Sequence, residues 1–404
     1  MSKSSLAVPI AAGVLTAFVG FASSFAVVLN GLTAVGASDA QAASGLMMLS
    51  IAMGLAGIVL SLWFRMPISG AWSLPGAALL AATGAPAGGF AAATGAFLVA
   101  GLLIVAAGLI RPFGRAVAAI PSALANAMLA GILFGLCLAP IKALIDTSTQ
   151  TTLIDTPTAT TLLILAWLLV SRWKRLYATP AAAIVAGLVI AFGGRGDAPD
   201  WAAVTPLVIW TTPHLSLEAL FSLALPLFIV TMASQNLPGL AVLSAYHYKP
   251  PPGPLIATTG VFTVLAAPFG GHAVNLSAVT AAMCASPDAS PDPAKRWIAS
   301  LTAGIVYIAF GLLAGGVTHF VAGWPLLIEA VAGLALLNAF GSALHNALAD
   351  ASEREAALAT FLVSSSGIAW HGIGGAFWGL LAGGVILVIT RAGASAPRPP
   401  GKPA

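Results

Sequence analysis

The sequence predicts an all-α polytopic membrane protein with fourteen transmembrane segments, arranged as a 7+7 inverted repeat. Of the 404 residues, 59% are hydrophobic and only 7% are charged, and the mean hydropathy is +0.99. Soluble chains carry about a quarter charged residues, which cover their water-facing surface. The composition therefore excludes a soluble globular domain. The pI near 9.3 reflects basic residues scattered between apolar runs and does not indicate a nucleic-acid-binding face.

Apolar runs separated by polar or Gly/Pro-rich breaks define the segments, seven on each side of a polar stretch at 195–217. The first seven lie near residues 9–29, 45–64, 70–83, 90–110, 121–143, 158–171 and 180–193. The second seven lie near residues 218–243, 254–267, 273–285, 297–320, 325–344, 355–370 and 374–390. An odd number of segments in each half requires the second half to enter the membrane in the opposite sense, which makes an inverted repeat.

The basic residues test this count, because short cytoplasmic loops of membrane proteins hold an excess of Lys and Arg. With the N-terminus inside, fourteen of the sixteen basic residues fall in cytoplasmic loops and tails, and only Lys142 and Arg195 fall outside. Adding or removing one segment would move later basic clusters to the wrong side. The sequence therefore predicts a multi-pass protein of the bacterial inner (cytoplasmic) membrane, with cytoplasmic N- and C-termini.

Segments 3 and 10 are the shortest and most Gly/Pro-interrupted of their halves. The fragment PISG at 67–70 aligns with PFGG at 268–271, at an offset of 201 residues, and a short Ala-rich match follows at the same offset. Such breaks are the usual sequence signal for discontinuous helices that line a site near the middle of the membrane. A chance match between two short fragments is the alternative explanation.

The charged residues restrict the chemistry of such a site. Ten of the twelve acidic residues lie in loops or at segment ends, and only Glu218 and Glu329 lie at the starts of apolar runs. No Lys or Arg falls at the predicted middle of the membrane. An anionic substrate would therefore be held by neutral polar side chains and by the N-termini of interrupted helices, which carry a partial positive charge.

The first site candidates lie at the broken starts of segments 10 and 3. Gly271 lets the chain turn and approach a ligand closely, and His272 and Asn275 follow it. His272 can titrate near neutral pH and is the candidate carrier of a coupling proton; a neutral histidine that bridges helices is the alternative. Gly70 belongs to the matching break in segment 3. Trp72 can offer a flat face to a planar ligand, although Trp is also common at membrane interfaces.

Segments 8 and 1 supply the other candidates. Gln235 and Asn236 interrupt an otherwise apolar segment with two amides, and each amide needs a hydrogen-bond partner in substrate or protein. Hydrogen bonding between helices is the alternative role for both. Ser23 and Ser24 are weaker candidates, because serines in membrane helices commonly bond their own helix or a close neighbour.

The sequence contains no nucleotide-binding loop of the GxxxxGK type, no metal-ligand spacing and no nucleophile motif. No pair of catalytic side chains falls at a common depth, so neither an enzyme nor a cofactor is expected. Transport energy would instead come from an ion gradient. One proton moving inward at about −100 mV is worth about 2.3 kcal/mol.

Four stretches carry a family resemblance that covers nearly the whole chain: PISGAWSLPG at 67–76, SQNLPG at 234–239, PFGGHAVN at 268–275 and AGLAL at 332–336. With them the chain resembles the benzoate:proton symporter family, within the wider group that shares the fold of the nucleobase and ascorbate transporters. In that fold, segments 3 and 10 each contain a short strand before a half-helix. The resemblance implies a substrate held between the half-helices and contacted by segments 1 and 8, and it implies that homodimers are common.

The resemblance also implies a core domain (segments 1–4 and 8–11) that moves against a gate domain (segments 5–7 and 12–14) to give alternating access. The boundaries that follow are 1–116 and 218–322 for the core, 117–196 and 323–391 for the gate, 197–217 for a periplasmic linker and 392–404 for a cytoplasmic tail.

Gln235 marks a departure from the nucleobase carriers, which place a glutamate in segment 8. A neutral amide suits a carboxylate substrate, since two like charges a few ångströms apart would repel. The sequence therefore predicts proton-coupled uptake of benzoate or a similar aromatic carboxylate, with His272 or the substrate carboxyl carrying the proton. The alternatives are a facilitative or channel-like anion pathway and a carrier for a planar, nucleobase-like substrate.

Overall fold

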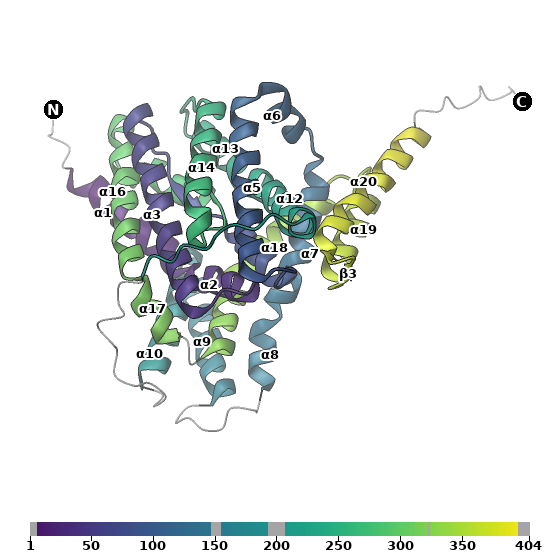
Figure 1. Ribbon diagram of the computed structural model, residues 1–404. Helices are drawn as coiled ribbons and strands as arrows, with labels where there is room; N and C mark the ends of the chain where they lie inside the picture. Colours follow the sequence, from purple (N-terminus) through teal and green to yellow (C-terminus); the bar gives the residue numbers. More distant parts are fainter. Residues whose placement is uncertain (1–5, 147–154, 193–206, 322–323, 395–404) are drawn as a thin grey trace, which may run out of the picture.

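The computed structural model describes residues 6–146, 155–192, 207–321 and 324–394, and these residues are mostly helical (Figure 1). Eight helical stretches within them are long and apolar enough to span a membrane. They are Ala7–Ala34, Asp39–Phe64, Gly89–Leu109, Ser122–Ile145, Arg175–Phe192, Leu217–Ala245, Pro252–Phe269 and Pro325–Leu348. The helical, polytopic membrane class predicted from composition is confirmed.

The elements follow one another in two series. The first contains α1 (Ala7–Ala22), α2 (Phe25–Ala34), α3 (Asp39–Phe64), β1 (Gly70–Trp72), α4 (Leu74–Thr83), α5 (Gly89–Leu109), α6 (Arg111–Ala118), α7 (Ser122–Cys137), α8 (Ala139–Ile145), α9 (Thr156–Trp173), η1 (Arg175–Tyr177) and α10 (Ala178–Phe192). The second contains α11 (Leu217–Ala219), η3 (Leu220–Ala224), α12 (Leu225–Thr231), η4 (Met232–Asn236), α13 (Leu237–Ala245), α14 (Pro252–Ala266), η5 (Ala267–Phe269), β2 (Val274–Leu276), α15 (Ala278–Ala285), η6 (Pro293–Lys295), α16 (Trp297–Leu312), α17 (Ala314–Val321), α18 (Pro325–Leu348), α19 (Arg354–Ser365), β3 (Ala369–Trp370), β4 (Ile373–Gly374) and α20 (Gly375–Ala394).

The first apolar run, expected as one segment at 9–29, is split into α1 and α2 by Ser23 and Ser24. The Ser24 hydroxyl donates to the carbonyl oxygen of Gly20 (2.6 Å), and the Ser23 hydroxyl donates to the same oxygen (3.2 Å). Serines that bond back to their own helix offer the backbone an alternative partner and often bend the helix. In segment 8 the helix continues through Pro238 instead, because this proline lies in the first turn of α13.

Two three-residue strands cross in the interior. β1 pairs antiparallel with β2, with Ala71 opposite Asn275 at the centre, and a short helix follows each strand. The two strand–helix units are 204 residues apart, since β1 begins at Gly70 and β2 begins at Val274. The offset of 201 residues inferred from the PISG and PFGG fragments is therefore wrong. β1 begins on the last residue of the first fragment, whereas His272 and Ala273 separate the second fragment from β2.

The long helices α16, α3, α14 and α5 stand side by side (Figure 1), and α3 and α14 contact the strand pair. Among them α3 packs along α16, and α14 packs along both α5 and α3. Glycines permit the α3–α16 contact, because a Cβ atom on Gly54 would lie 2.5 Å from the Gly304 carbonyl oxygen and one on Gly304 would lie 2.6 Å from the Gly54 oxygen. Helices in membranes commonly associate through small residues, since lipid supplies no hydrophobic driving force between them.

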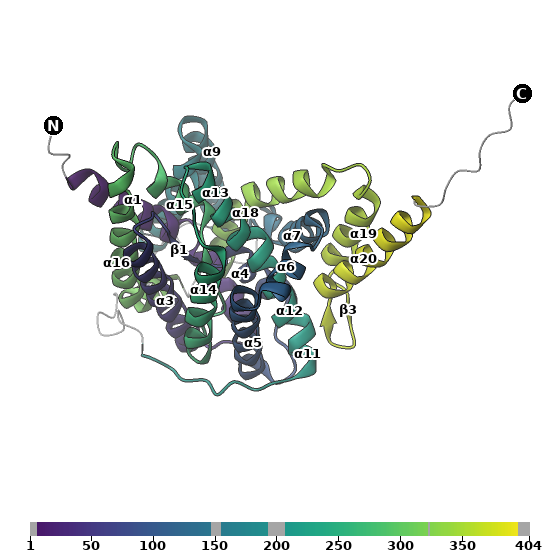
Figure 2. The same cartoon turned by 90° about the horizontal axis from the view of Figure 1, so that it is seen from above.

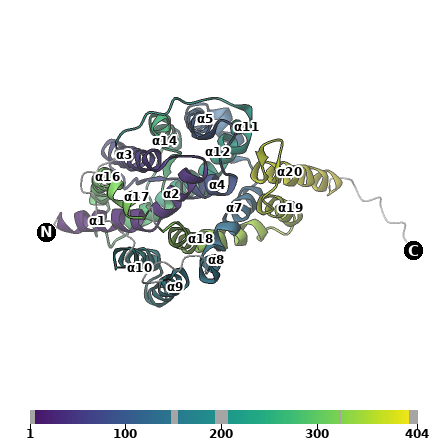
Figure 3. The same cartoon turned by 60° about the horizontal axis from the view of Figure 1, so that its bottom comes forward.

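A second group of helices lies beside this one. α7 packs along α18, α9 pairs with α10, and α19 pairs with α20. In Figure 3, α8, α9 and α10 lie beside α18, on the side of the molecule opposite α3 and α14. From above, β1 lies among the helices of the first group, while α19 and α20 project away from it (Figure 2). The two groups meet where α2 contacts α18 and α4 contacts α7.

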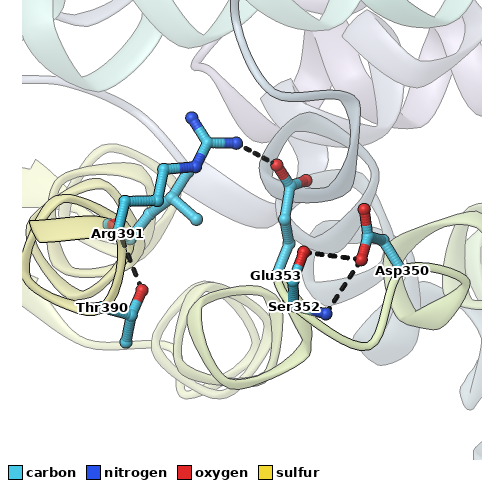
Figure 4. Close-up of polar contacts among 6 residues, drawn as sticks. Asp350, Ser352, Glu353, Thr390 and Arg391 are labelled. Atoms are coloured by element: carbon cyan, nitrogen blue, oxygen red, sulfur yellow. Dashed lines mark hydrogen bonds and ion pairs between the residues drawn. The ribbon is translucent and has the colours of Figure 1, made fainter. Parts of the chain in front are cut away.

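Polar contacts join the start of α19 to the end of α20 (Figure 4). Arg391 of α20 forms an ion pair with Glu353, the residue before α19. Asp350 accepts hydrogen bonds from the hydroxyl (2.7 Å) and the backbone N–H (2.8 Å) of Ser352. These two bonds, the hydroxyl bond foremost, hold the pKa of the Asp350 carboxyl below its usual value. The turn between α18 and α19 is thus fixed by charged and capping groups.

Substitution of Gly304 by alanine tests the α3–α16 contact. The new methyl group would overlap the Gly54 carbonyl, so we expect the variant to lose about 1–3 kcal/mol of stability and to melt at a lower temperature. Gly384 of α20 is the matched control, because a Cβ atom there meets nothing within 4 Å. Alanine in place of an unconstrained helical glycine stabilises by about 0.5–1 kcal/mol. Both are measured by thermal melting in one detergent, and an unchanged melting temperature for Gly304→Ala would contradict this packing.

Candidate functional site

Buried polar side chains gather around the β1–β2 pair, inside an otherwise apolar body. Eight of them, each less than a tenth exposed, are Ser69, Ser73, Thr231, Asn236, His272, Asn275, Ser277 and Thr280. Polar groups in a membrane interior need partners within the protein, because no water or lipid headgroup is available to them. The hydrogen bonds of these residues therefore define how the centre is held together.

The strand pair is closed by equivalent bonds at its two ends. The Ser73 N–H donates to the Ala273 carbonyl (3.0 Å), and the Ser277 N–H donates to the Ser69 carbonyl (3.0 Å). Ser73 and Ser277 directly follow β1 and β2, so each bond extends the ladder by one residue. The Ser69 hydroxyl also accepts a hydrogen bond from the Thr280 hydroxyl (2.8 Å). The backbone of this centre is thus nearly symmetric about the middle of the strand pair.

The helix after each strand begins with a serine cap. The Ser73 hydroxyl accepts from the Gly76 N–H (3.1 Å), and the Ser277 hydroxyl accepts from the Thr280 N–H (3.2 Å). From α12, the Thr231 hydroxyl donates to the Ser73 hydroxyl oxygen (3.0 Å). Each cap satisfies one N–H of the first turn and fixes the start of the helix at the strand pair. The partial positive charges of α4 and α15 are therefore both placed at this centre.

His272 is fully buried two residues before β2, and it bridges the two halves of the chain. Its Nε2 lies 2.9 Å from the carbonyl oxygen of Ser73. A carbonyl can only accept, so Nε2 carries a hydrogen and donates it. No described residue donates to Nδ1, and the Phe97 ring packs against the imidazole in a T-shaped contact. His272 thus bridges the two halves of the chain through Nε2, while Nδ1 has no hydrogen-bond partner among the described residues.

Two of the candidate amides are engaged within the protein. The Asn236 oxygen accepts from the Leu276 N–H (2.9 Å), which ties η4 to β2, and its amide nitrogen lies 3.4 Å from the Met232 sulfur. With its amide oriented to satisfy both neighbours, Asn275 accepts from the Ser73 N–H (3.2 Å) and donates to the Leu276 carbonyl (3.0 Å). Both asparagines hold the strand pair in place.

Gln235 differs from the adjacent Asn236. Its side chain is half-buried and forms no hydrogen bond with any residue that the structure describes. It lies in the π-helical turn η4, which contacts β2 and α7. Such wide turns within α-helices are frequent at functional sites. Gln235 therefore offers an amide with two donor hydrogens and a carbonyl oxygen to a ligand beside the strand pair.

Aromatic rings line the other flank of the centre, at the break between α1 and α2. Trp72 of β1 is buried and donates from Nε1 to the Ser24 hydroxyl oxygen (2.9 Å). Phe21 packs against Trp72, with 5.4 Å between ring centroids. It also contacts Phe310 (5.1 Å) and stacks on Phe25 (5.9 Å). Trp72 is thus an interior residue and not an interfacial one, and the rings form an apolar surface next to a polar backbone.

The candidate glycines are explained by close packing. A Cβ atom on Gly70 would collide with the backbone carbonyl of Met53 in α3, and one on Gly271 would collide with Ala266 at the end of α14. The preceding residue, Gly270, has a φ of +92°, which favours glycine. These glycines therefore let the strand pair fit against α3 and α14.

Ser73 is a site residue that the sequence analysis misses, although its N–H, carbonyl and hydroxyl all hold the centre together. A signal was present, because a serine followed by Leu-Pro is typical of a capped helix start with proline in the first turn. Phe21 and Phe310 are also missed. An apolar run does not distinguish a ring that lines a site from one that faces lipid.

The sequence matches the benzoate membrane transport protein family (BenE) over residues 3–389. Inner membrane protein YdcO of Escherichia coli (strain K12) is 41% identical over 381 residues, covering 94% of each chain. The benzoate membrane transport protein of Acinetobacter baylyi is 31% identical over 376 residues, covering 92% of each chain. The similarity therefore extends across nearly the whole length of all three proteins.

Solved structures show the same fold at low sequence identity. The transmembrane domain of the cyanobacterial bicarbonate transporter BicA superposes with a TM-score of 0.61 at 15% identity, covering 98% of this chain and 99% of that one. SLC26A9 superposes with a TM-score of 0.61 at 14% identity, covering 97% and 66%. Neither is a nucleobase or ascorbate transporter, the group named by the sequence resemblance. The sequence match decides the family: the chain belongs to the benzoate membrane transport protein family.

Proposed function

We propose that this protein is a secondary active transporter that takes up benzoate or a similar aromatic carboxylate, together with a proton, across the bacterial inner membrane. The observation that carries the proposal is the unbonded amide of Gln235 beside two capped helix starts and an aromatic surface. The name of the Acinetobacter baylyi relative supports the substrate class. The bicarbonate transported by BicA supports an anionic substrate for this fold.

The carboxylate would be bound without a buried cation. No Lys or Arg is among the eight buried polar residues of the centre. The starts of α4 and α15 supply partial positive charge, and the Gln235 amide supplies donor hydrogens. A hydrogen bond to a charged group is worth about 1.5–3 kcal/mol, so a few such contacts suffice for micromolar-range binding.

The ring of the substrate would lie on the aromatic surface of Phe21, Phe25, Trp72 and Phe310. Aromatic side chains prefer offset-stacked or edge-to-face contacts, which add about 0.5–1.5 kcal/mol to the burial of the ring. The Trp72 indole is held in one orientation by its bond to Ser24. An aromatic acid therefore matches both sides of the centre, with the ring on one flank and the carboxylate on the other.

We assign fourteen segments to the observed elements: α1–α2, α3, β1–α4, α5, α7–α8, α9 and α10, then α11–α13, α14, β2–α15, α16–α17, α18, α19 and α20. The near-symmetric strand pair and the α3–α16 and α14–α5 contacts support an inverted repeat. In this architecture segments 3 and 10 are the discontinuous ones. Both termini are cytoplasmic, and a homodimer is the assembly that the family resemblance favours.

Alternating access would come from movement of the core against the gate. The core is 1–116 and 218–322, the gate is 117–196 and 323–391, the periplasmic linker is 197–217 and the cytoplasmic tail is 392–404. The core then holds the whole strand pair, and the gate presents α7 and α18 to it. Contacts of α2 with α18 and of α4 with α7 are the surfaces that would slide.

His272 is our candidate for the coupling proton. Its Nδ1 can accept a proton only if a negative charge lies nearby, because an isolated buried imidazolium is unfavourable. A carboxylate in the centre supplies that charge. Proton and anion would then enter the interior as a neutral pair, which couples their movements.

Replacement of Gln235 by alanine tests the substrate site. We expect the KM for benzoate uptake into proteoliposomes to rise about tenfold or more, because a donor to the carboxylate is lost. Gln41→Ala is the matched control, since this glutamine lies in the cap of α3 and bonds Ser38 and Thr211. Equal KM values for the Gln235 variant and wild type would remove Gln235 from the site.

Replacement of His272 by glutamine tests coupling. A glutamine amide can still donate to the Ser73 carbonyl but cannot take up a proton. We therefore expect benzoate exchange to persist, while the ratio of internal to external benzoate reached under a proton gradient falls to about one. His345→Gln, at an exposed position of α18, should accumulate benzoate as wild type does. Full accumulation by the His272 variant would leave the substrate carboxyl as the proton carrier. Benzoate flux in wild type that does not depend on the proton gradient would instead favour the facilitative pathway.

A further inference from the structure

A cavity of about 230 Å³, lined by both polar and apolar residues, lies where α2, α3 and α17 meet α18. Figure 3 shows α2, α17 and α18 next to one another at this place. Its polar lining consists of Asn30 and Thr33 from α2, Asp39 from α3, Thr318 from α17 and Glu329 from α18. In the architecture proposed above, α18 belongs to the gate and the other three helices belong to the core. The cavity is therefore a junction between the two bodies that transport would move.

Glu329 is unusual for its position inside an apolar spanning helix. It is the fifth residue of the span Pro325–Leu348, is half-buried, and forms no hydrogen bond or ion pair with any described residue. An ionisable residue within a spanning segment is costly and commonly functional. In the present conformation the cavity has room for several waters, which can solvate a carboxylate. If α2 closed against α18, that water would have to leave.

The lining offers acceptors in place of that water. The Thr33 hydroxyl donates to the Leu29 carbonyl (3.0 Å), and the Thr318 hydroxyl donates to the Ala314 carbonyl (2.8 Å). A hydroxyl has one hydrogen, so both oxygens can only accept from a group in the cavity. A neutral carboxyl can donate to such oxygens, whereas a carboxylate cannot. Of the polar side chains in the lining, Asn30 alone has hydrogens that can be donated to a carboxylate, and one donor does not replace the water that a charged glutamate would lose. A closed, dry cavity would therefore favour the protonated form of Glu329.

The charges around Glu329 act in the same direction. Asp39 lies in the first turn of α3, where the helix dipole favours a negative charge, and it shares the cavity with Glu329. Two carboxylates in a shrinking cavity repel each other. On α8, which also packs against α18, Lys142 is exposed and does not line the cavity. Asp39, which is exposed, is thus the one other charged residue among those that line the cavity.

We propose that Glu329 is a proton-binding site at the outer mouth of the transporter, and that this cavity closes only when Glu329 is neutral. The inference rests on the proposed function, because it requires movement of core against gate. The proposed orientation places the start of α18 on the periplasmic side. Glu329 then binds and releases its proton on that one side, so it sets the rate of turnover and not the proton stoichiometry.

Benzoate exchange at equal pH on both sides and at saturating benzoate tests the site. Wild-type exchange should fall about tenfold or more between about pH 6 and pH 8, because the neutral fraction of a carboxyl falls tenfold per pH unit above its pKa. Glu329→Gln should exchange benzoate at both pH values at the rate that wild type shows at about pH 6, within about twofold. Glu329→Asp should restore the fall. Glu355→Gln, at an exposed position in the first turn of α19, should behave as wild type.

A second readout does not depend on the substrate. A Thr33→Cys variant, in a Cys137→Ser background, is labelled with a membrane-impermeant maleimide with Glu329 intact or replaced by glutamine. The labelling rate with Glu329 intact is divided by the rate with Glu329→Gln, and this ratio cancels the pH dependence of the thiol itself. It should rise from about one at low pH to severalfold at high pH, because only the charged glutamate holds the cavity open.

The outcomes separate this inference from the function on which it rests. Absence of benzoate exchange in wild type overturns the substrate assignment, while the labelling ratio still decides whether Glu329 operates the cavity. A pH profile that Glu329→Gln leaves unchanged, or a constant labelling ratio, overturns the inference. Loss of exchange in both Glu329→Gln and Glu329→Asp also overturns it, because the residue would then be structural. Loss of exchange in the glutamine variant alone overturns it as well, because a permanently neutral side chain is expected to keep the fast exchange.

Discussion

The pairing of β1 with β2 is the interaction on which the rest of the structure depends. Non-helical backbone that is buried at membrane depth is out of reach of water, so its N–H and carbonyl groups must bond within the protein. Here three paired residues on each side are extended by Ser73 and Ser277, which then cap α4 and α15. The His272 bridge and the Asn236 bond to β2 use groups that this pairing brings into place. Loss of the pairing would leave all of them unsatisfied.

A centre built from dipoles has a consequence for a carrier of anions. A buried Lys or Arg would bind a carboxylate strongly, but it would be left uncompensated whenever the site was empty, at a cost of several kcal/mol. Capped helix starts and a neutral amide need no counterion. In the proposed cycle the empty core can therefore return across the membrane without carrying a second ion, while the loaded core stays neutral if a proton travels with the substrate.

The sequence predicts those site residues that are polar and lie within apolar runs. Gln235, Asn236, His272 and Asn275 stand out as polar residues inside apolar runs, and all four lie at the strand pair or in the adjoining turn. The repeat offset is wrong by three residues, because short Pro/Gly fragments mark a break without fixing where its strand begins. The ring of Phe310 and the cavity beside Glu329 are created by packing between distant helices. Periodicity within one segment cannot show such contacts.

Two protonatable residues at different depths can have different tasks in one cycle. His272 lies at the strand pair, which alternating access would open to each side in turn, so a proton held there can cross with the substrate. Glu329 lies near one end of α18, so a proton bound there returns to the side from which it came. A group that exchanges protons with one side only cannot draw free energy from a transmembrane gradient. It can still decide when a conformational change occurs, because it changes the relative stability of the open and closed cavity. In the proposed cycle His272 would thus couple transport to the proton gradient, and Glu329 would control when the cavity closes. A substitution at one of the two residues can then change its own task without changing the other.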